Sequence, residues 1–61
     1  MSLQASRNYI ASLKQAGNTV SIVPDLEMTR LTLSTWQELR VNGKFRCNIV
    51  NGCIALGTMV G

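Results

Sequence analysis

"IVNGCI", residues 49–54, places an Asn-Gly pair between two short apolar runs. Such a pair is typical of a two-residue type I′ turn between antiparallel strands, because both turn positions require a positive φ angle. The sequence therefore predicts a β-hairpin with strands over residues 45–50 and 53–58. The predicted register pairs residues directly across the turn: Val50 with Cys53, and Ile49 with Ile54.

Side chains alternate between the two faces of this predicted hairpin, and one face is apolar enough to meet a core. That core-facing set is Phe45, Cys47, Ile49, Ile54 and Leu56. The opposite face is predicted to meet solvent or a partner, and it includes Arg46, Asn48, Val50 and Cys53.

The two cysteines of the chain lie on opposite faces of the predicted hairpin. Cys47 and Cys53 are also offset along the strands, so their separation is too large for a disulfide. Because the chain has no histidine, a C-x5-C spacing supplies too few ligands for a closed zinc site. We therefore expect two free thiols, no bound metal and no cofactor.

Upstream of the hairpin, apolar residues at helical spacing predict a helix over residues 2–16, with Ser2 as its N-cap and Gly17 after its end. A short strand over 19–23 is predicted next, because β-branched residues dominate it and a proline ends it. The following stretch, residues 24–31, fits either a short helix that begins at Pro24 or an alternating strand, and we favour the helix.

The stretch LSTWQELRVNGKF, residues 33–45, predicts a further helix. Ser34 and Gln37 match a capping box, and Gly43 suits the position after a helix end. The buried face of this helix would carry Leu33, Trp36 and Leu39. The whole chain, residues 1–61, is then a single small α+β domain with an N-terminal helix, a short strand, a second helix and a C-terminal Asn-Gly β-hairpin, which is the element order of a winged helix.

Length and composition narrow the class of protein. The chain has 61 residues, six Lys and Arg against three Asp and Glu, and a net charge of +3, which favours an anionic partner such as nucleic acid. One Trp, one Tyr and one Phe make a thin core, which a homodimer would supplement. No apolar run is long enough to span a membrane and no secretory signal is evident, so we expect a soluble cytoplasmic protein with no membrane partner.

Candidates for catalysis are few. Without histidine, a general base would have to be Asp25, Glu27 or Glu38. Asp25 and Glu27 are two positions apart and do not share a helix face. Ser34 is explained as a helix cap, and the scattered glycines form no phosphate-binding loop. We expect a protein that is not an enzyme.

Two short motifs resemble a known family. STWQELRVNGKF, residues 34–45, is similar to the second helix and following turn of the small AlpA-type regulators and excisionases of prophages and conjugative elements. The matching positions are Ser34, Thr35, Leu39, Gly43, Lys44 and Phe45. NIVNGCIAL, residues 48–56, resembles the Asn-Gly wing of some excisionases. The resemblance implies a winged-helix protein that binds and bends double-stranded DNA without catalysis of its own.

The same resemblance implies a set of DNA-contacting residues. The groove-facing helix would carry Thr35, Gln37 and Arg40. Contacts with the phosphate backbone or the minor groove would come from Lys44, Arg46 and Asn51.

The alternative is a small phage or plasmid protein that binds and inhibits a host protein. CIALGTMVG, residues 53–61, would then be an exposed edge strand open to strand addition, or a strand that completes a homodimer sheet. The placement of Arg40, Lys44 and Arg46 distinguishes the two functions. If they line one face together with the predicted wing, DNA binding is favoured, and if they scatter, protein binding is favoured.

Overall fold

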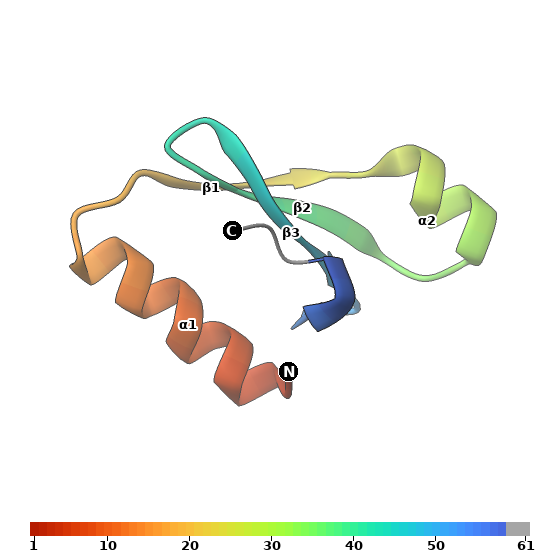
Figure 1. Cartoon of the computed structure of the whole chain (residues 1–61). Helices are drawn as coiled ribbons and strands as arrows, with labels where there is room; N and C mark the ends of the chain where they lie inside the picture. The colour runs from red at the N-terminus through yellow and green to blue at the C-terminus, as the bar shows by residue number, and fades with distance from the viewer. Residues whose placement is uncertain (59–61) are drawn as a thin grey trace.

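A computed structural model describes residues 1–58 of the chain (Figure 1). Its elements are, in chain order, α1 (Leu3–Gln15), β1 (Val20–Pro24), α2 (Leu26–Thr32), β2 (Trp36–Val41), β3 (Lys44–Val50), β4 (Cys53–Ile54) and the 3-10 turn η1 (Leu56–Thr58). Within these residues the strands form one four-stranded antiparallel sheet in the order β1-β2-β3-β4. The predicted α+β layout, with an N-terminal helix, a short strand, a second helix and a C-terminal hairpin, is confirmed, but the second helix is α2 and not the stretch 33–45.

Helix α1 packs on one face of the sheet, which we call the inner face. Ser2 begins the helix, because its Oγ accepts a hydrogen bond from the Ala5 N–H at 3.0 Å. Its apolar side contributes Tyr9, Ile10 and Leu13. These pack on the buried residues of the sheet, which are Leu39, Cys47, Ile49 and Ile54. The helix predicted over 2–16 is confirmed.

The helix predicted within residues 33–45 is wrong. Trp36–Val41 is strand β2, which pairs with β1 on one side and with β3 on the other. Its side chains alternate, with Leu39 and Val41 buried and Arg40 exposed between them. Gly43 belongs to a tight turn rather than to a helix end, because Asn42 and Gly43 both have positive φ angles, of 54° and 79°. Hydrogen bonding of residues 36–41 to a strand on each side outweighed the local capping-box pattern that favours a helix.

The hairpin at Asn51-Gly52 is confirmed. These two residues have φ angles of 52° and 83°, and the register pairs Ile49 with Ile54 and Val50 with Cys53. The second strand is shorter than predicted, because β4 contains 2 residues and the chain then enters η1. Within residues 1–58, the edge strand predicted over 53–61 is therefore formed only at Cys53–Ile54, and residues 59–61 lie outside the described part.

An irregularity in β3 changes which face Phe45 occupies. The register shifts between Leu39 and Arg40, so that Leu39 lies opposite Cys47 whereas Arg40 lies opposite Phe45. One extra residue in β3 accounts for this shift. Phe45 therefore lies with Arg40 on the outer face and is 40% exposed. The prediction that Phe45 shares the core face with Cys47 is wrong. The prediction that Leu56 faces the core is also wrong, because Leu56 is exposed in η1.

The thiols are as predicted. Cys47 and Cys53 are both free. Cys47 is buried on the inner face, whereas Cys53 is half-buried opposite Val50 on the outer face.

Candidate functional site

The residues predicted to face a DNA groove do not lie on a helix. Thr35 is in the segment before β2, Gln37 is half-buried within that strand, and Arg40 points to the outer face near its end. An extended strand with neighbours on both sides cannot enter a major groove as a recognition helix does. The predicted groove-facing helix is therefore wrong, because its residues form the second strand of the sheet.

The basic residues around β3 differ in their surroundings. The Arg40 guanidinium donates to the Glu38 carboxylate, with Nη2 to Oε1 at 3.0 Å, so part of its charge is neutralised. Lys44 is exposed at the start of β3, whereas Arg46 is half-buried. Burial raises the pKa of the Cys47 thiol, and the nearby positive charge of Arg46 opposes that rise.

Asn51 lies at the other end of β3 from Lys44. The two positions are separated by the length of the strand, which is roughly 20 Å at the usual rise per residue. The Asn51 side chain has a structural role, because its Oδ1 accepts a hydrogen bond from the Thr35 N–H at 3.0 Å. The predicted DNA-contacting residues therefore do not form one surface, and Arg40, Lys44 and Arg46 are not joined to the predicted wing.

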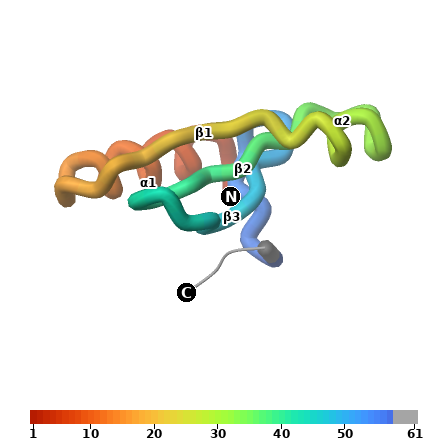
Figure 2. The backbone as a smooth tube through the Cα atoms, turned by 90° about the horizontal axis from the view of Figure 1, so that it is seen from above, coloured from red at the N-terminus to blue at the C-terminus, as the bar shows by residue number. Residues whose placement is uncertain are grey.

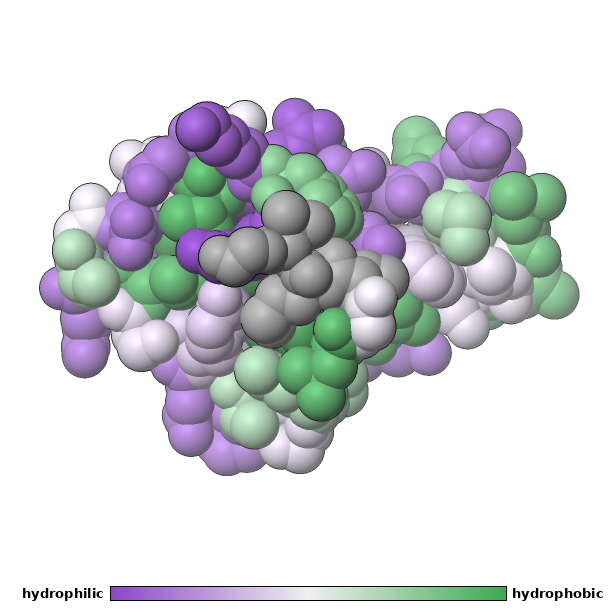
Figure 3. All heavy atoms as spheres, in the orientation of Figure 1, coloured by the Kyte–Doolittle hydropathy of each residue, from purple (hydrophilic) through white to green (hydrophobic). Residues whose placement is uncertain are grey.

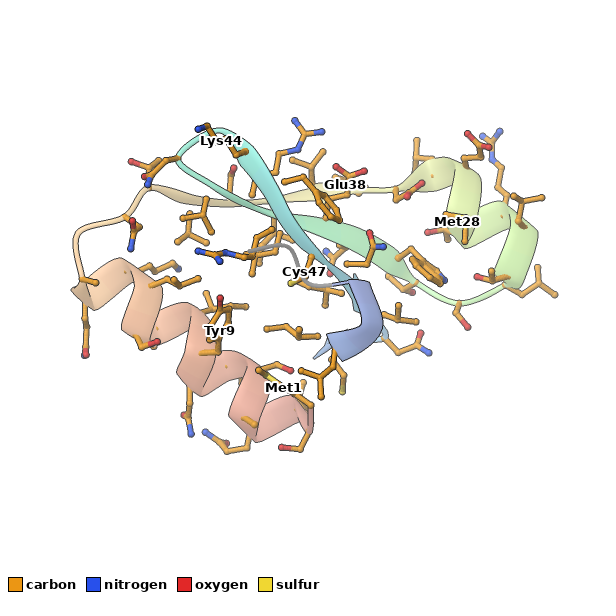
Figure 4. The ribbon with its side chains drawn as sticks, viewed as in Figure 1. Met1, Tyr9, Met28, Glu38, Lys44 and Cys47 are labelled. Carbon is orange, nitrogen blue, oxygen red and sulfur yellow. The ribbon has the colours of Figure 1, made fainter. Side chains whose placement is uncertain are left out.

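The structure does bring a further basic residue to the end of the molecule at the β2–β3 turn. Asn42 Nδ2 donates to Asn18 Oδ1 at 3.0 Å, and Asn18 Nδ2 donates to the Leu13 carbonyl at 3.1 Å. These bonds fix the last turn of α1, which carries Lys14, beside the turn. We call this region the basic end, and its residues are Lys14, Arg40, Lys44 and Arg46. Figure 4 shows Lys44 at this end and Met28 at the opposite one.

Helix α2 occupies the opposite end. Figures 1 and 2 both place it beyond the ends of the strands. Asp25 begins the helix, because its Oδ1 accepts from the Met28 N–H at 3.1 Å. Thr29 fastens it to the sheet, since its Oγ1 accepts from the Trp36 N–H at 3.0 Å. The short helix favoured for residues 24–31 is confirmed, with Asp25 as its N-cap and Leu26, rather than Pro24, as its first residue.

Three leucines at this end are left in water. Leu26 is 64% exposed, Leu31 is 71% exposed and Leu33 is 93% exposed. We call them the leucine surface, and Figure 3 shows apolar side chains over this end of the molecule. The sequence patterns missed this surface, and Leu33 was predicted to be buried. No glycine or asparagine marks the end of α2, so no local signal placed Leu33 outside a helix.

Leu33 also has an unusual backbone conformation. It ends α2 with φ 60° and ψ 19°, in the left-handed region, and its N–H donates to the Thr29 carbonyl at 3.0 Å. This position usually holds glycine or asparagine, because a side chain there costs about 1–2 kcal/mol. Leu33 therefore combines an unfavourable backbone conformation with an exposed apolar side chain.

The edge of the sheet at β4 is covered. Ser6 is buried in α1, and its Oγ accepts a hydrogen bond from the Ile54 N–H at 2.8 Å. The Ile54 carbonyl accepts from the N-terminal ammonium of Met1 at 3.0 Å. Both outward-facing backbone groups of Ile54 are thus paired, and this edge does not offer them to another strand.

Comparisons with known proteins add no relative. No protein-family model, curated protein or solved structure matches the chain. Within residues 1–58, no group of three or more His, Cys, Asp or Glu side chains is placed to hold a metal ion. The described helices are all too short or too polar to cross a membrane.

Proposed function

We propose that this protein is a non-catalytic binding module that docks on another protein through the leucine surface. The observation that carries the proposal is the exposure of Leu26, Leu31 and Leu33 on one short helix and its cap, between 64% and 93%. Full burial of one leucine side chain contributes about 1.5–3 kcal/mol. Burial of all three against a partner would contribute about 4.5–9 kcal/mol, from which the cost of association must be subtracted.

The partner implied is a protein with an apolar pocket or groove. Three leucines lie in water at the α2 end, whereas the buried apolar residues in the described part of the chain are Leu39, Val41, Cys47, Ile49 and Ile54. Exposed Glu27 and Arg30 of α2 lie among the leucines and would form the polar rim that surrounds an apolar contact. Inhibition of a host protein, as the sequence suggested, is one activity that such docking would produce.

Replacing Leu33 with glycine tests the proposal, because the effects on stability and on binding have opposite signs. Leu33→Gly relieves the left-handed backbone and should raise the melting temperature. The same change removes an apolar anchor and should weaken capture of the partner. Capture from a lysate of the source organism, followed by mass spectrometry, would compare the parent protein with this variant and with Leu31→Ser.

Leu56→Ser is the matched control, because Leu56 is 60% exposed but lies in η1, away from α2. The proposal expects the same protein to be captured by the parent and by the control, and to be reduced at least tenfold with Leu33→Gly and with Leu31→Ser. Equal capture by all four proteins would contradict it.

A second candidate function is binding to double-stranded DNA. It is supported by the basic end, which gathers four of the six Lys and Arg residues of the chain. Phe45 is exposed there, opposite Arg40 on the outer face. Phosphate contacts from this end would replace the base contacts that the resemblance implied for Thr35 and Gln37, since those two residues lie on no helix.

The salt dependence of binding tests this second candidate. Changing both Lys14 and Lys44 to alanine should lower the slope of log K against log salt by about 1 for each DNA phosphate that a lysine no longer neutralises. Changing both Arg7 and Arg30 to alanine removes the same net charge elsewhere and is the control. Equal slopes for the two double variants, or no binding by the parent protein at low salt, would contradict DNA binding through the basic end.

A further inference from the structure

Strand β1 forms the second edge of the sheet, and its outward side differs from that of β4. The backbone bonds at its two ends show which residues face β2: Asn42 N–H donates to the Thr19 carbonyl at 2.7 Å, and Asp25 N–H donates to the Trp36 carbonyl at 3.0 Å. Because hydrogen-bonded positions alternate along an antiparallel strand, Ser21 and Val23 also bond to β2. The backbone groups that point away from the sheet are those of Val20, Ile22 and Pro24.

None of the usual devices that block an edge strand protects this edge within Val20–Pro24, apart from the terminal proline. No charged residue occurs between Lys14 and Asp25. Ile22 lies opposite Leu39 and therefore points to the inner face, yet it is 45% exposed. At β4, by contrast, Ser6 of α1 occupies the outward N–H.

We propose that β1 pairs with β1 of a second copy of this chain, antiparallel and centred on Ile22, so that the two four-stranded sheets join into one. The outward-facing groups are arranged to fit such a pairing. Ile22 would lie opposite Ile22 of the other copy, where each N–H meets the other carbonyl. Val20 would lie opposite Pro24, whose carbonyl accepts the Val20 N–H.

The position of Pro24 suits this register. Proline has no N–H to donate. Because Pro24 lies at the end of the strand, only the carbonyl of the opposite Val20 would lack a partner in the paired strands. Centring on Ile22 also overlaps the whole of Val20–Pro24, the full strand. Val20, Ile22 and Pro24 would then form one apolar strip on the joined inner face, because residues opposite each other share a face.

Two further observations favour a second copy as the occupant. The strand is uncharged, so two copies of a chain with net charge +3 meet there without placing like charges opposite each other. The buried apolar core is also small, with five residues among those that the structure describes. Association that covers Ile22 would extend this core, which is how small domains commonly gain stability.

Sedimentation velocity over rising protein concentration tests the dimer. The parent should shift from monomer to dimer. Ile22→Pro removes one outward N–H without touching the bonds to β2, and it should sediment as a folded monomer, with its fold checked by circular dichroism. Leu33→Gly and Leu56→Ser change exposed leucines elsewhere and should dimerise as the parent does.

Amide hydrogen exchange on the unmodified protein provides a second readout that does not depend on any variant. Ser21 and Val23 amides should be protected at all concentrations, and the Ile22 amide should become at least tenfold slower as the dimer forms. A parent that stays monomeric, or a dimer in which the Ile22 amide still exchanges quickly, would overturn the proposal. Failure of the dimer proposal can be distinguished from failure of the leucine-surface proposal, because Ile22→Pro should still capture the partner protein.

Discussion

The two turns at either end of β3 have the same sequence, Val-Asn-Gly, and nearly the same backbone. Asn42 and Gly43 have φ angles of 54° and 79°, and Asn51 and Gly52 have φ angles of 52° and 83°. In both turns the asparagine also pairs with a threonine that precedes a strand. Asn42 exchanges bonds of 2.7 Å and 2.9 Å with Thr19, and Asn51 exchanges bonds of 2.8 Å and 3.0 Å with Thr35.

The turns differ in what surrounds them. Asn42 donates a further bond to Asn18 and so holds the end of α1, whereas the Asn51 side chain bonds to Thr35. Gly52 lies against α1, because a Cβ added there would be 3.2 Å from Leu3 Cδ1, whereas a Cβ at Gly43 would meet no atom within 4 Å. The two turns therefore share their local chemistry but are attached to α1 differently, through a hydrogen bond from Asn42 to Asn18 and through the packing of Gly52 against Leu3.

Gly52→Val should have the largest effect on stability. A β-branched residue is strained at positive φ, which costs about 1–3 kcal/mol, and the new side chain would also displace Leu3. We expect the free energy of unfolding to fall by about 3 kcal/mol, measured by urea denaturation. Gly57→Val is the control, because a Cβ there meets no atom within 4 Å and its φ angle is not in the left-handed region. An equal loss from both changes would contradict this explanation.

Gly43→Val should cost less than Gly52→Val, about 1–2 kcal/mol, because it adds the same backbone strain in open space. The same denaturation experiment measures the difference between the two variants. If the two glycine changes cost the same, then the packing of Gly52 against Leu3 contributes nothing and the two turns are equivalent.

Replacing each asparagine with glycine should separate the two side-chain networks. Glycine tolerates the positive φ angle, so the loss in stability reports the hydrogen bonds of the side chain. Asn42→Gly should cost about 1–2 kcal/mol and Asn51→Gly about 1 kcal/mol, since a typical net hydrogen bond contributes about 0.5–1.5 kcal/mol. When Asn18 is also changed to Ala, Asn42→Gly and Asn51→Gly should cost nearly the same. If Asn42→Gly still costs more, the bond to Asn18 is not the cause of the difference.

The smallest effect concerns Cys47, which lies in β3 between the two turns. Burial raises the pKa of its thiol above the ordinary value of 9.0 in the folded state. The unfolded chain therefore releases the thiol proton at a lower pH than the folded chain does. The protonated thiol contributes fully to the free energy of unfolding below the unfolded pKa, and this contribution falls as the pH rises above that value. Unfolding free energies between pH 8 and 10 should decrease, and Cys47→Ala should show a smaller slope over that range. An unchanged slope would contradict the assignment to Cys47.

The comparison of the turns also shows what the sequence could reveal. Local signals were sufficient for α1, β1 and the turn at Asn51-Gly52, because caps, β-branched runs and Asn-Gly pairs act over a few residues. The identical Asn42-Gly43 pair was read as a helix end, since Leu33, Trp36 and Leu39 also fit helical spacing. The strand at β2 exists because β1 and β3 pair with it, and neither pairing is visible within its own residues.

The candidate sites were predicted less well than the fold. The clustering of Lys14 with Lys44 depends on the bond between Asn18 and Asn42, which joins residues 24 positions apart. The extra residue in β3, which turns Phe45 outward, has no glycine or proline to mark it. The leucine surface was missed because Leu33 was assigned to the buried face of a helix over residues 33–45, whereas it ends α2.

The hydrogen bond between Ser6 and Ile54 has a consequence for the order of folding. These residues are 48 positions apart, so α1 cannot reach its native neighbours until Ile54 has been synthesised. The two hairpins around β3 form from residues close in sequence, and such local contacts close quickly. The helix that is made first should therefore be the element that docks last, and its apolar side stays open to misassociation in the interval.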